Sequence, residues 1–134
     1  MELAVRYFGK PDGYSFEKNE YVECVAAEND LCFFSKNGDD YLASPRRLDG
    51  FINDTRFLVL PIHGDYAEVG AWVRDSKPVA SDDKVKVAVG DWALLSCGRG
   101  THALVQVREL KGLDRERRVV LFFAYSSLVG EMSF

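Results

Sequence analysis

Short apolar runs separated by turn residues dominate the sequence, and the periodicity of an amphipathic helix is almost absent. Residues 101–109 alternate, with Ala103, Val105 and Val107 on one face, which is typical of a strand with one buried side. Residues 119–125 are an unbroken apolar run and indicate a central strand. The same reasoning predicts further strands over residues 3–8, 21–27, 31–36, 41–43, 57–62, 68–73 and 85–95.

Turn signals separate these runs. The dipeptide Asn37-Gly38 is the strongest hairpin signal, because both residue types readily adopt the positive φ angles of a tight turn. Residues 75–83 are the most polar and least patterned stretch and predict a linker or a long loop, and the charged residues 111–118 predict another loop. A helix over residues 19–32 is an alternative, but the β-branched and aromatic content there favours strands.

Strands spaced roughly 8–12 residues apart with turns between them predict an all-β barrel or sandwich. The length of 134 residues suits one domain. We therefore expect a single compact all-β domain over residues 1–134, and a subdivision near residues 75–83 is the alternative.

Composition narrows the class of protein. The chain is 47% hydrophobic and has a net charge of −4, which fits a folded domain and argues against wholesale binding of nucleic acid. No apolar run approaches the roughly 20 residues of a membrane-spanning helix, and the first residues lack the pattern of a secretory signal. The three cysteines form no C-x-x-C pair, so we expect an intracellular, reducing location, with no metal and no cofactor.

One candidate catalytic set combines a histidine with a cysteine. His102 opens an apolar strand after a Gly-rich turn, and Gly90-Asp91 precedes it. This order resembles the corresponding segment of cysteine peptidases and amidases of the CHAP and NlpC/P60 type, and the resemblance implies Cys24 or Cys32 as nucleophile with His102 as its base. Neither cysteine follows a turn that would place it at a helix N-terminus, where a thiolate is stabilised, so an enzyme is the alternative prediction.

Basic residues suggest a second alternative, binding of RNA. Arg46 and Arg47 are adjacent, and a second group lies near residues 108–118 but alternates with acidic residues. Residues 85–110 resemble PUA-like and ASCH small barrels, which handle RNA. Because the chain is acidic overall, RNA binding is a less favoured prediction than protein binding. The second group consists of Arg108, Lys111, Arg115, Arg117 and Arg118.

An excess of aromatic residues favours a binding surface for a protein or peptide. Trp and Tyr side chains line grooves that hold peptides or methylated lysine. The negative balance of the chain suggests a partner with a basic segment. The residues that we expect to bind this partner are Trp72, Trp92 and Tyr125, together with Asp91 and Glu109.

Three segments resemble the core of a bromo-adjacent homology (BAH) domain. They are residues 89–95 (VGDWALL), 103–110 (ALVQVREL) and 118–125 (RVVLFFAY), about a third of the chain. The family has a strand ending W-F-Y-R-P, and Ser126 and Ser127 stand here at the arginine and proline positions. The resemblance implies an SH3-like distorted barrel of short antiparallel strands that binds histone tails or other proteins without catalysis, and a nuclear location.

Overall fold

A computed structural model describes residues 1–47 and 50–134, and it confirms the predicted antiparallel β class. One α-helix, α1 (Tyr66–Ser76), and one 3₁₀ turn, η1 (Asp114–Glu116), accompany the strands. The strands are β1 (Glu2–Arg6), β2 (Gly13–Ser15), β3 (Glu20–Val22), β4 (Cys32–Lys36), β5 (Asp39–Ala43), β6 (Arg46–Arg47), β7 (Gly50–Phe51), β8 (Arg56–Val59), β9 (Lys84–Val87), β10 (Trp92–Ser96), β11 (His102–Lys111) and β12 (Arg118–Ser126).

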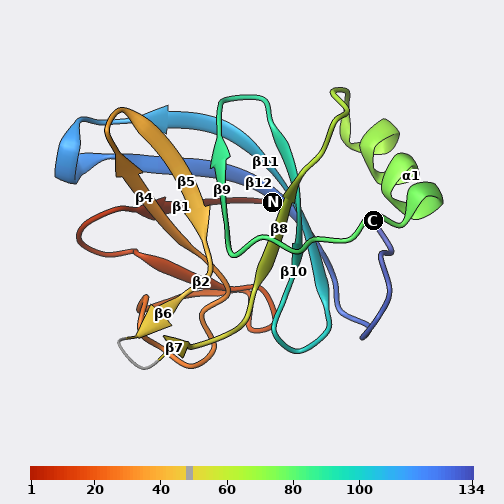
Figure 1. The fold of residues 1–134 in the computed structure, drawn as a ribbon, viewed down its shortest axis with the longest axis horizontal. Helices are drawn as coiled ribbons and strands as arrows, with labels where there is room; N and C mark the ends of the chain where they lie inside the picture. The colour runs from red at the N-terminus through yellow and green to blue at the C-terminus, as the bar shows by residue number, and fades with distance from the viewer. Residues whose placement is uncertain (48–49) are drawn as a thin grey trace.

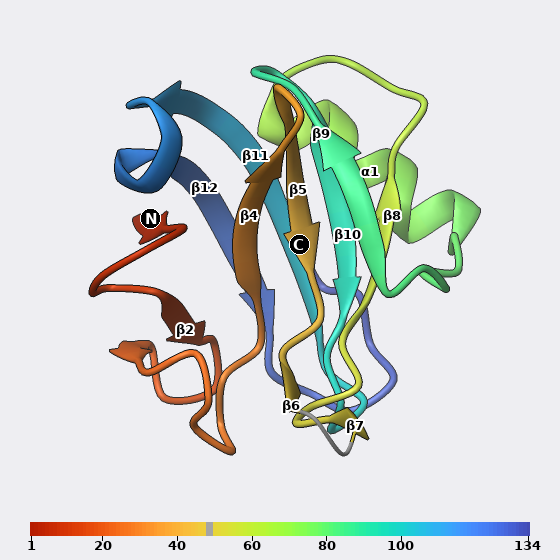
Figure 2. The same ribbon diagram turned by 60° about the vertical axis from the view of Figure 1, so that its left-hand side comes forward.

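Two antiparallel sheets enclose the main hydrophobic core (Figures 1 and 2). The larger sheet has the order β1-β12-β11-β10-β8, and the smaller one has the order β4-β5-β9. Two short pairs, β2-β3 and β6-β7, lie beside them. The alternation predicted for β11 is confirmed, because every second residue of its first half faces this core. Core residues include Leu3, Val5, Phe33, Leu42, Ala103, Val105, Val107, Val119, Leu121 and Phe123.

The two sheets do not close into a barrel. In the described part of the chain, β8 meets the segment before β9 through a single bridge between Phe57 and Asp82, and no ladder joins β1 to β4. The predicted barrel is therefore corrected to two facing sheets that approach each other along their edges.

The helix α1 contradicts the prediction of a strand over residues 68–73, and it includes the first two residues of the loop predicted over residues 75–83, while residues 77–83 form a loop as predicted. Asp65 caps its N-terminus by accepting a hydrogen bond from the Glu68 amide at 2.9 Å. Val69 and Val73, one helical turn apart, are buried against the outer face of the larger sheet. The helix ends at Ser76, and the C-cap residue Lys77 has a left-handed φ of 45°. With this helix the domain is mainly β rather than all-β.

Other predicted elements are partly confirmed. The β4–β5 hairpin turns at Asn37 and Gly38, which have φ angles of 54° and 81°. The run over residues 85–95 is divided at Gly90, with φ of 94°, into β9 and β10. The alternative helix over residues 19–32 is wrong, and of the strand predicted over residues 21–27 only the first two residues belong to β3.

The free edge of β1 is covered by the segment that follows it. The Ala4 amide donates to the Tyr21 hydroxyl at 3.0 Å, and the Arg6 amide donates to the Pro11 carbonyl at 2.8 Å. Both amides point away from β12, so residues outside the sheet occupy hydrogen-bonding positions that a further strand would need.

Among the described residues, no helix is long and apolar enough to cross a membrane.

Candidate functional site

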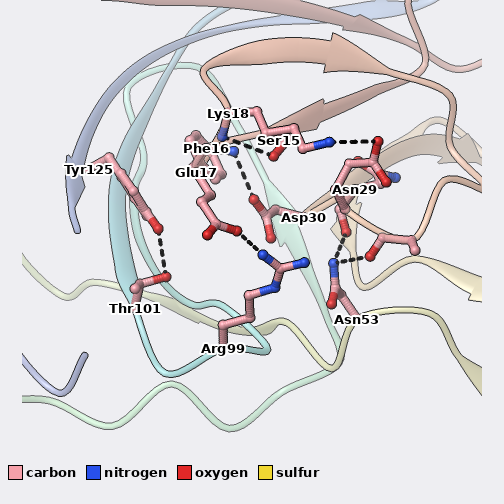
Figure 3. A network of polar contacts seen from close by, with 12 residues as sticks. Ser15, Phe16, Glu17, Lys18, Asn29, Asp30, Asn53, Arg99, Thr101 and Tyr125 are labelled. Carbon is pink, nitrogen blue, oxygen red and sulfur yellow. Dashed lines mark hydrogen bonds and ion pairs between the residues drawn. The ribbon is translucent and has the colours of Figure 1, made fainter. Parts of the chain in front are cut away.

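A pocket of about 440 Å³ lies at the end of the larger sheet where β10 turns into β11. Four separate parts of the chain form it: the β2–β3 turn, the segment before β4, the β10–β11 turn, and the end of β12 with the residues after it. We call it the Asp30 pocket (Figure 3). Its lining residues are Glu17, Asp30, Cys97, Arg99, Thr101, Tyr125, Ser127 and Val129.

Asn29 holds the segment that carries the central carboxylate. Its Oδ1 accepts hydrogen bonds from the amides of Tyr14 at 2.9 Å and Leu31 at 3.3 Å. Its Nδ2 donates to the Cys24 carbonyl at 3.1 Å. A Cβ at Gly13 would lie 2.7 Å from the Asn29 side chain, so glycine permits this close approach. The buried side-chain amide of Asn29 thus holds an irregular loop against β2 through hydrogen bonds to backbone groups.

Asp30 is placed by this loop and is only 7% exposed. Its amide donates to the Tyr14 carbonyl at 2.9 Å, and its Oδ2 accepts a hydrogen bond from the Phe16 amide at 2.8 Å. Asn53 adds a brace from the opposite side, because its Nδ2 donates to the Asn29 carbonyl at 2.8 Å. The carboxylate is therefore held in one position at the pocket.

The environment of Asp30 disfavours its charge. Burial raises the pKa of the carboxyl to about 6, while the Phe16 amide and the more distant Arg99 act in the opposite direction. Within the described residues, no salt bridge reaches Asp30. At neutral pH the site thus contains a largely buried carboxylate that lacks a paired cation, which is a costly arrangement in the free protein.

The rim of the pocket combines an ion pair with a hydroxyl pair. Arg99 pairs with Glu17 across the mouth, and both side chains are more than half exposed. On the wall, the Tyr125 hydroxyl donates to Thr101 Oγ1 at 2.9 Å. Gly100, with φ of 86°, completes the tight turn that presents Arg99, so the turn predicted from the glycines here is confirmed.

Of the residues predicted to bind a partner, only Tyr125 lines this pocket. Trp92 is 1% exposed and donates from Nε1 to the Gly64 carbonyl at 3.0 Å, so its ring belongs to the core beneath α1. Trp72 is half-buried on α1 and packs against the same core. Asp91 accepts a hydrogen bond from the Ala88 amide at 2.9 Å and so closes the turn before β10. Glu109 pairs with Lys111 at 2.8 Å on the exposed end of β11.

The thiols do not have the environment of a cysteine nucleophile. Burial raises the pKa of Cys32 to about 12, and burial together with Asp12 raises the pKa of Cys24. His102 Nδ1 lies 3.0 Å from the Glu131 carbonyl, and in residues 1–47 and 50–134 no hydrogen bond joins it to either cysteine. All three cysteines are free. The peptidase alternative therefore gains no support from the geometry.

The basic group predicted for RNA is partly neutralised by its own neighbours. Arg117 forms a two-point contact with Asp40, at 3.0 Å from Nε and 2.8 Å from Nη2. Arg108 lies over the Phe122 ring at 5.2 Å, and Arg115 lies over the Phe8 ring at 5.1 Å. These contacts lie at the other end of β11 and β12 from the Asp30 pocket or along their outer face.

Sequence reasoning missed Asp30 and Thr101. Asp30 follows Glu28 and Asn29 in a stretch that resembles an exposed turn, and no local pattern shows that tertiary contacts bury it. Among the described residues, no group of three or more histidine, cysteine or acidic side chains is arranged to hold a metal ion.

A scan against protein-family models and searches of the curated proteins and of the solved structures found no match.

Proposed function

We propose that this protein is a non-enzymatic binding module and that the Asp30 pocket takes a basic side chain from a protein or peptide partner. The observation that carries this proposal is a carboxylate that is 7% exposed, held at a cavity of about 440 Å³, and without an ion-pair partner among the described residues. Pockets of this size accommodate small ligand groups.

A cation that enters the pocket would offset the free-energy cost of the buried, unpaired Asp30 carboxylate. Asp30 has already lost most of its hydration on folding, and the rigid loop around Asn29 has already fixed its position. A guanidinium or ammonium group would therefore gain a charge-assisted hydrogen bond without a further cost of ordering the acceptor. The Tyr125 and Thr101 hydroxyls supply additional polar contacts on the wall.

The charge distribution supports a basic partner. Residues 12–31, which include two lining residues of the pocket, contain six acidic residues and one basic residue. A net charge of −5 over 20 residues exceeds the −4 of the entire chain, so the remainder is slightly basic. Such a surface would speed the approach of a basic segment and orient it toward the pocket. The acidic residues are Asp12, Glu17, Glu20, Glu23, Glu28 and Asp30.

A fluorescein-labelled peptide with three arginines tests this function by fluorescence anisotropy. We expect it to bind at low salt, and we expect a peptide with citrulline in place of arginine, which has nearly the same shape without the charge, to bind much more weakly. Asp30→Asn should weaken binding at least tenfold, because it removes the charge that assists the hydrogen bond. Asp75→Asn, which removes an exposed charge on α1, is the matched control and should change little. Equal binding of the two peptides, or full binding by Asp30→Asn, would refute the proposal.

The likeness to BAH domains and the nuclear location that it implies remain predictions. A histone-like basic segment is one partner that would meet the chemistry proposed for the pocket.

A further inference from the structure

We propose that a second copy of this chain supplies a ligand for the Asp30 pocket, by inserting the tip between β11 and β12, and that the protein thereby associates head to tail. This inference rests on the proposed function, because it names the partner of the same pocket. We call residues 112–117 the β11–β12 tip.

The tip carries an apolar and a basic side chain on a projection. Leu113 is 82% exposed, the largest exposed fraction among the big apolar side chains of the described residues. Arg115 is exposed two residues later, and its guanidinium lies over the Phe8 ring. An exposed cation–π contact of this kind contributes only about 0.5–1 kcal/mol, so the side chain can leave it for a stronger partner. Leu113 and Arg115 are thus both exposed at the tip, where their side chains can contact another molecule.

The tip and the pocket lie at opposite ends of the same strands. β11 runs from His102, beside the pocket, to Lys111, beside the tip, and β12 returns from Arg118 to Ser126. Figures 1 and 2 show the β11–β12 connection at one extremity of the molecule and the β10–β11 turn at a different one. A chain therefore cannot insert its tip into its own pocket. Contact between the two surfaces requires another molecule.

The charges that remain unpaired are separated in the same way. In the described part of the chain, the basic side chains near the tip without a salt bridge are those of Arg6, Lys36, Arg115 and Arg118, and the unpaired acidic ones are Asp114 and Glu116. Near the pocket, the described acidic side chains of Asp30 and Glu20 have no salt bridge. The unpaired charges of one end thus complement those of the other.

The lining of the pocket also suits both groups of the tip. Val129, Cys97 and the ring of Tyr125 offer apolar surface for a leucine, and Asp30 offers the carboxylate for a guanidinium. Because the two surfaces differ, the contact is heterologous, and repetition produces rings or open chains rather than a symmetric dimer.

Two variants separate the two halves of the contact. Asp30→Asn weakens the pocket and leaves the tip intact, and Arg115→Glu reverses the charge of the tip and leaves the pocket intact. We expect sedimentation velocity at low salt to show the wild-type protein associating with increasing concentration beyond the 15.1 kDa of one chain. Each variant alone should need at least tenfold higher concentration to associate, as should the wild-type protein in high salt.

A mixture of the Asp30→Asn and Arg115→Glu variants is the decisive experiment for the head-to-tail contact. The tip of Asp30→Asn and the pocket of Arg115→Glu are both functional, so the mixture should form a complex of about twice the mass of one chain and stop there. Asp75→Asn and Lys77→Glu, which change exposed charges at α1, are the controls and should associate like the wild type.

Three results would overturn the inference: a wild-type protein that stays at one chain at every concentration and salt, variants that associate like the wild type, or a mixture that does not form the complex. The arginine peptide distinguishes the two proposals. If it binds Arg115→Glu in the manner expected of the Asp30 pocket while the wild type does not self-associate, only the head-to-tail contact is wrong. If the peptide does not bind either, the proposed function fails as well.

Discussion

Replacing Asp30 by asparagine should stabilise the protein at neutral pH. The asparagine side chain has nearly the same shape, and its carbonyl oxygen can still accept the hydrogen bond from the Phe16 amide. The substitution removes the negative charge. Asp30 is only 7% exposed, and its carboxylate has no paired cation among the described residues. A variant that weakens binding would thus strengthen folding, as expected where a functional group is held at a cost to stability.

The magnitude follows from the pKa of the carboxyl, which burial raises from 3.8 to about 6. A raised pKa in the folded state means that the native protein binds more protons than the unfolded chain between these two values. Stability contributed by this group is therefore present at low pH and is lost as pH rises toward 6. A difference of about two in pKa corresponds to about 3 kcal/mol. Asp30→Asn should escape this loss entirely.

Urea unfolding at several pH values measures the effect. The variant should exceed the wild type by up to about 3 kcal/mol at pH 7. The difference should fall below about 1 kcal/mol at pH 4, where Asp30 is protonated in the folded protein and about half protonated in the unfolded chain. Comparing the two proteins at each pH cancels the titration of other groups. A variant that is less stable at pH 7, or a difference that does not depend on pH, would show that the carboxylate is already well satisfied in the free protein. Asp30 would then gain little from a cation ligand.

Further outcomes test the pocket and the core. Binding of the arginine peptide should be constant above pH 7 and weaken by up to about tenfold per pH unit below the pKa of Asp30, about 6, because the cation needs the ionised carboxylate; anisotropy titrations at pH 5 and 7.5 check this. Arg99→Ala should tighten binding of the same peptide, since it removes a positive charge that repels the ligand at the mouth, and weaker binding would instead make Arg99 part of the contact. Asn29→Ala should cost about 2–4 kcal/mol in urea unfolding, because it leaves several backbone groups unpaired. Leu121→Ala should cost about 2–5 kcal/mol, and Val120→Ala clearly less, because only the former fills the core between the sheets; equal losses would contradict the assigned faces of β12.

The strands of the larger sheet could be predicted because their signals are local. The alternation along β11 and the apolar run of β12 are sufficient by themselves, since one face or both faces of each strand are buried. The sequence of α1 also contains a local pattern that favours a helix despite its two β-branched valines. Asp65 followed three residues later by Glu68 is the spacing of a helix N-cap, and the valines at positions 69 and 73 are four residues apart.

The Asp30 pocket could not be predicted in this way. Its lining residues come from four segments between positions 17 and 129, and only the pairing of β2, β11 and β12 with their neighbours brings these segments together. The position of Asp30 depends on hydrogen bonds with residues 14 or more positions away, since its amide donates to the Tyr14 carbonyl and its carboxylate accepts from the Phe16 amide. Tyr125 was predicted for its aromatic character, and its contribution here lies equally in its hydroxyl.

The Tyr21 hydroxyl at the edge of β1 has a consequence for solubility. An exposed strand edge with unpaired amides is a template on which other molecules can add strands and start cross-β aggregates. The Tyr21 hydroxyl accepts a hydrogen bond from the Ala4 amide, and the Pro11 carbonyl accepts one from the Arg6 amide. Two amides at this edge are therefore no longer available to an added strand. Pro11 and Tyr21 therefore cover part of the edge of the N-terminal strand, which disfavours the addition of a strand from another molecule there.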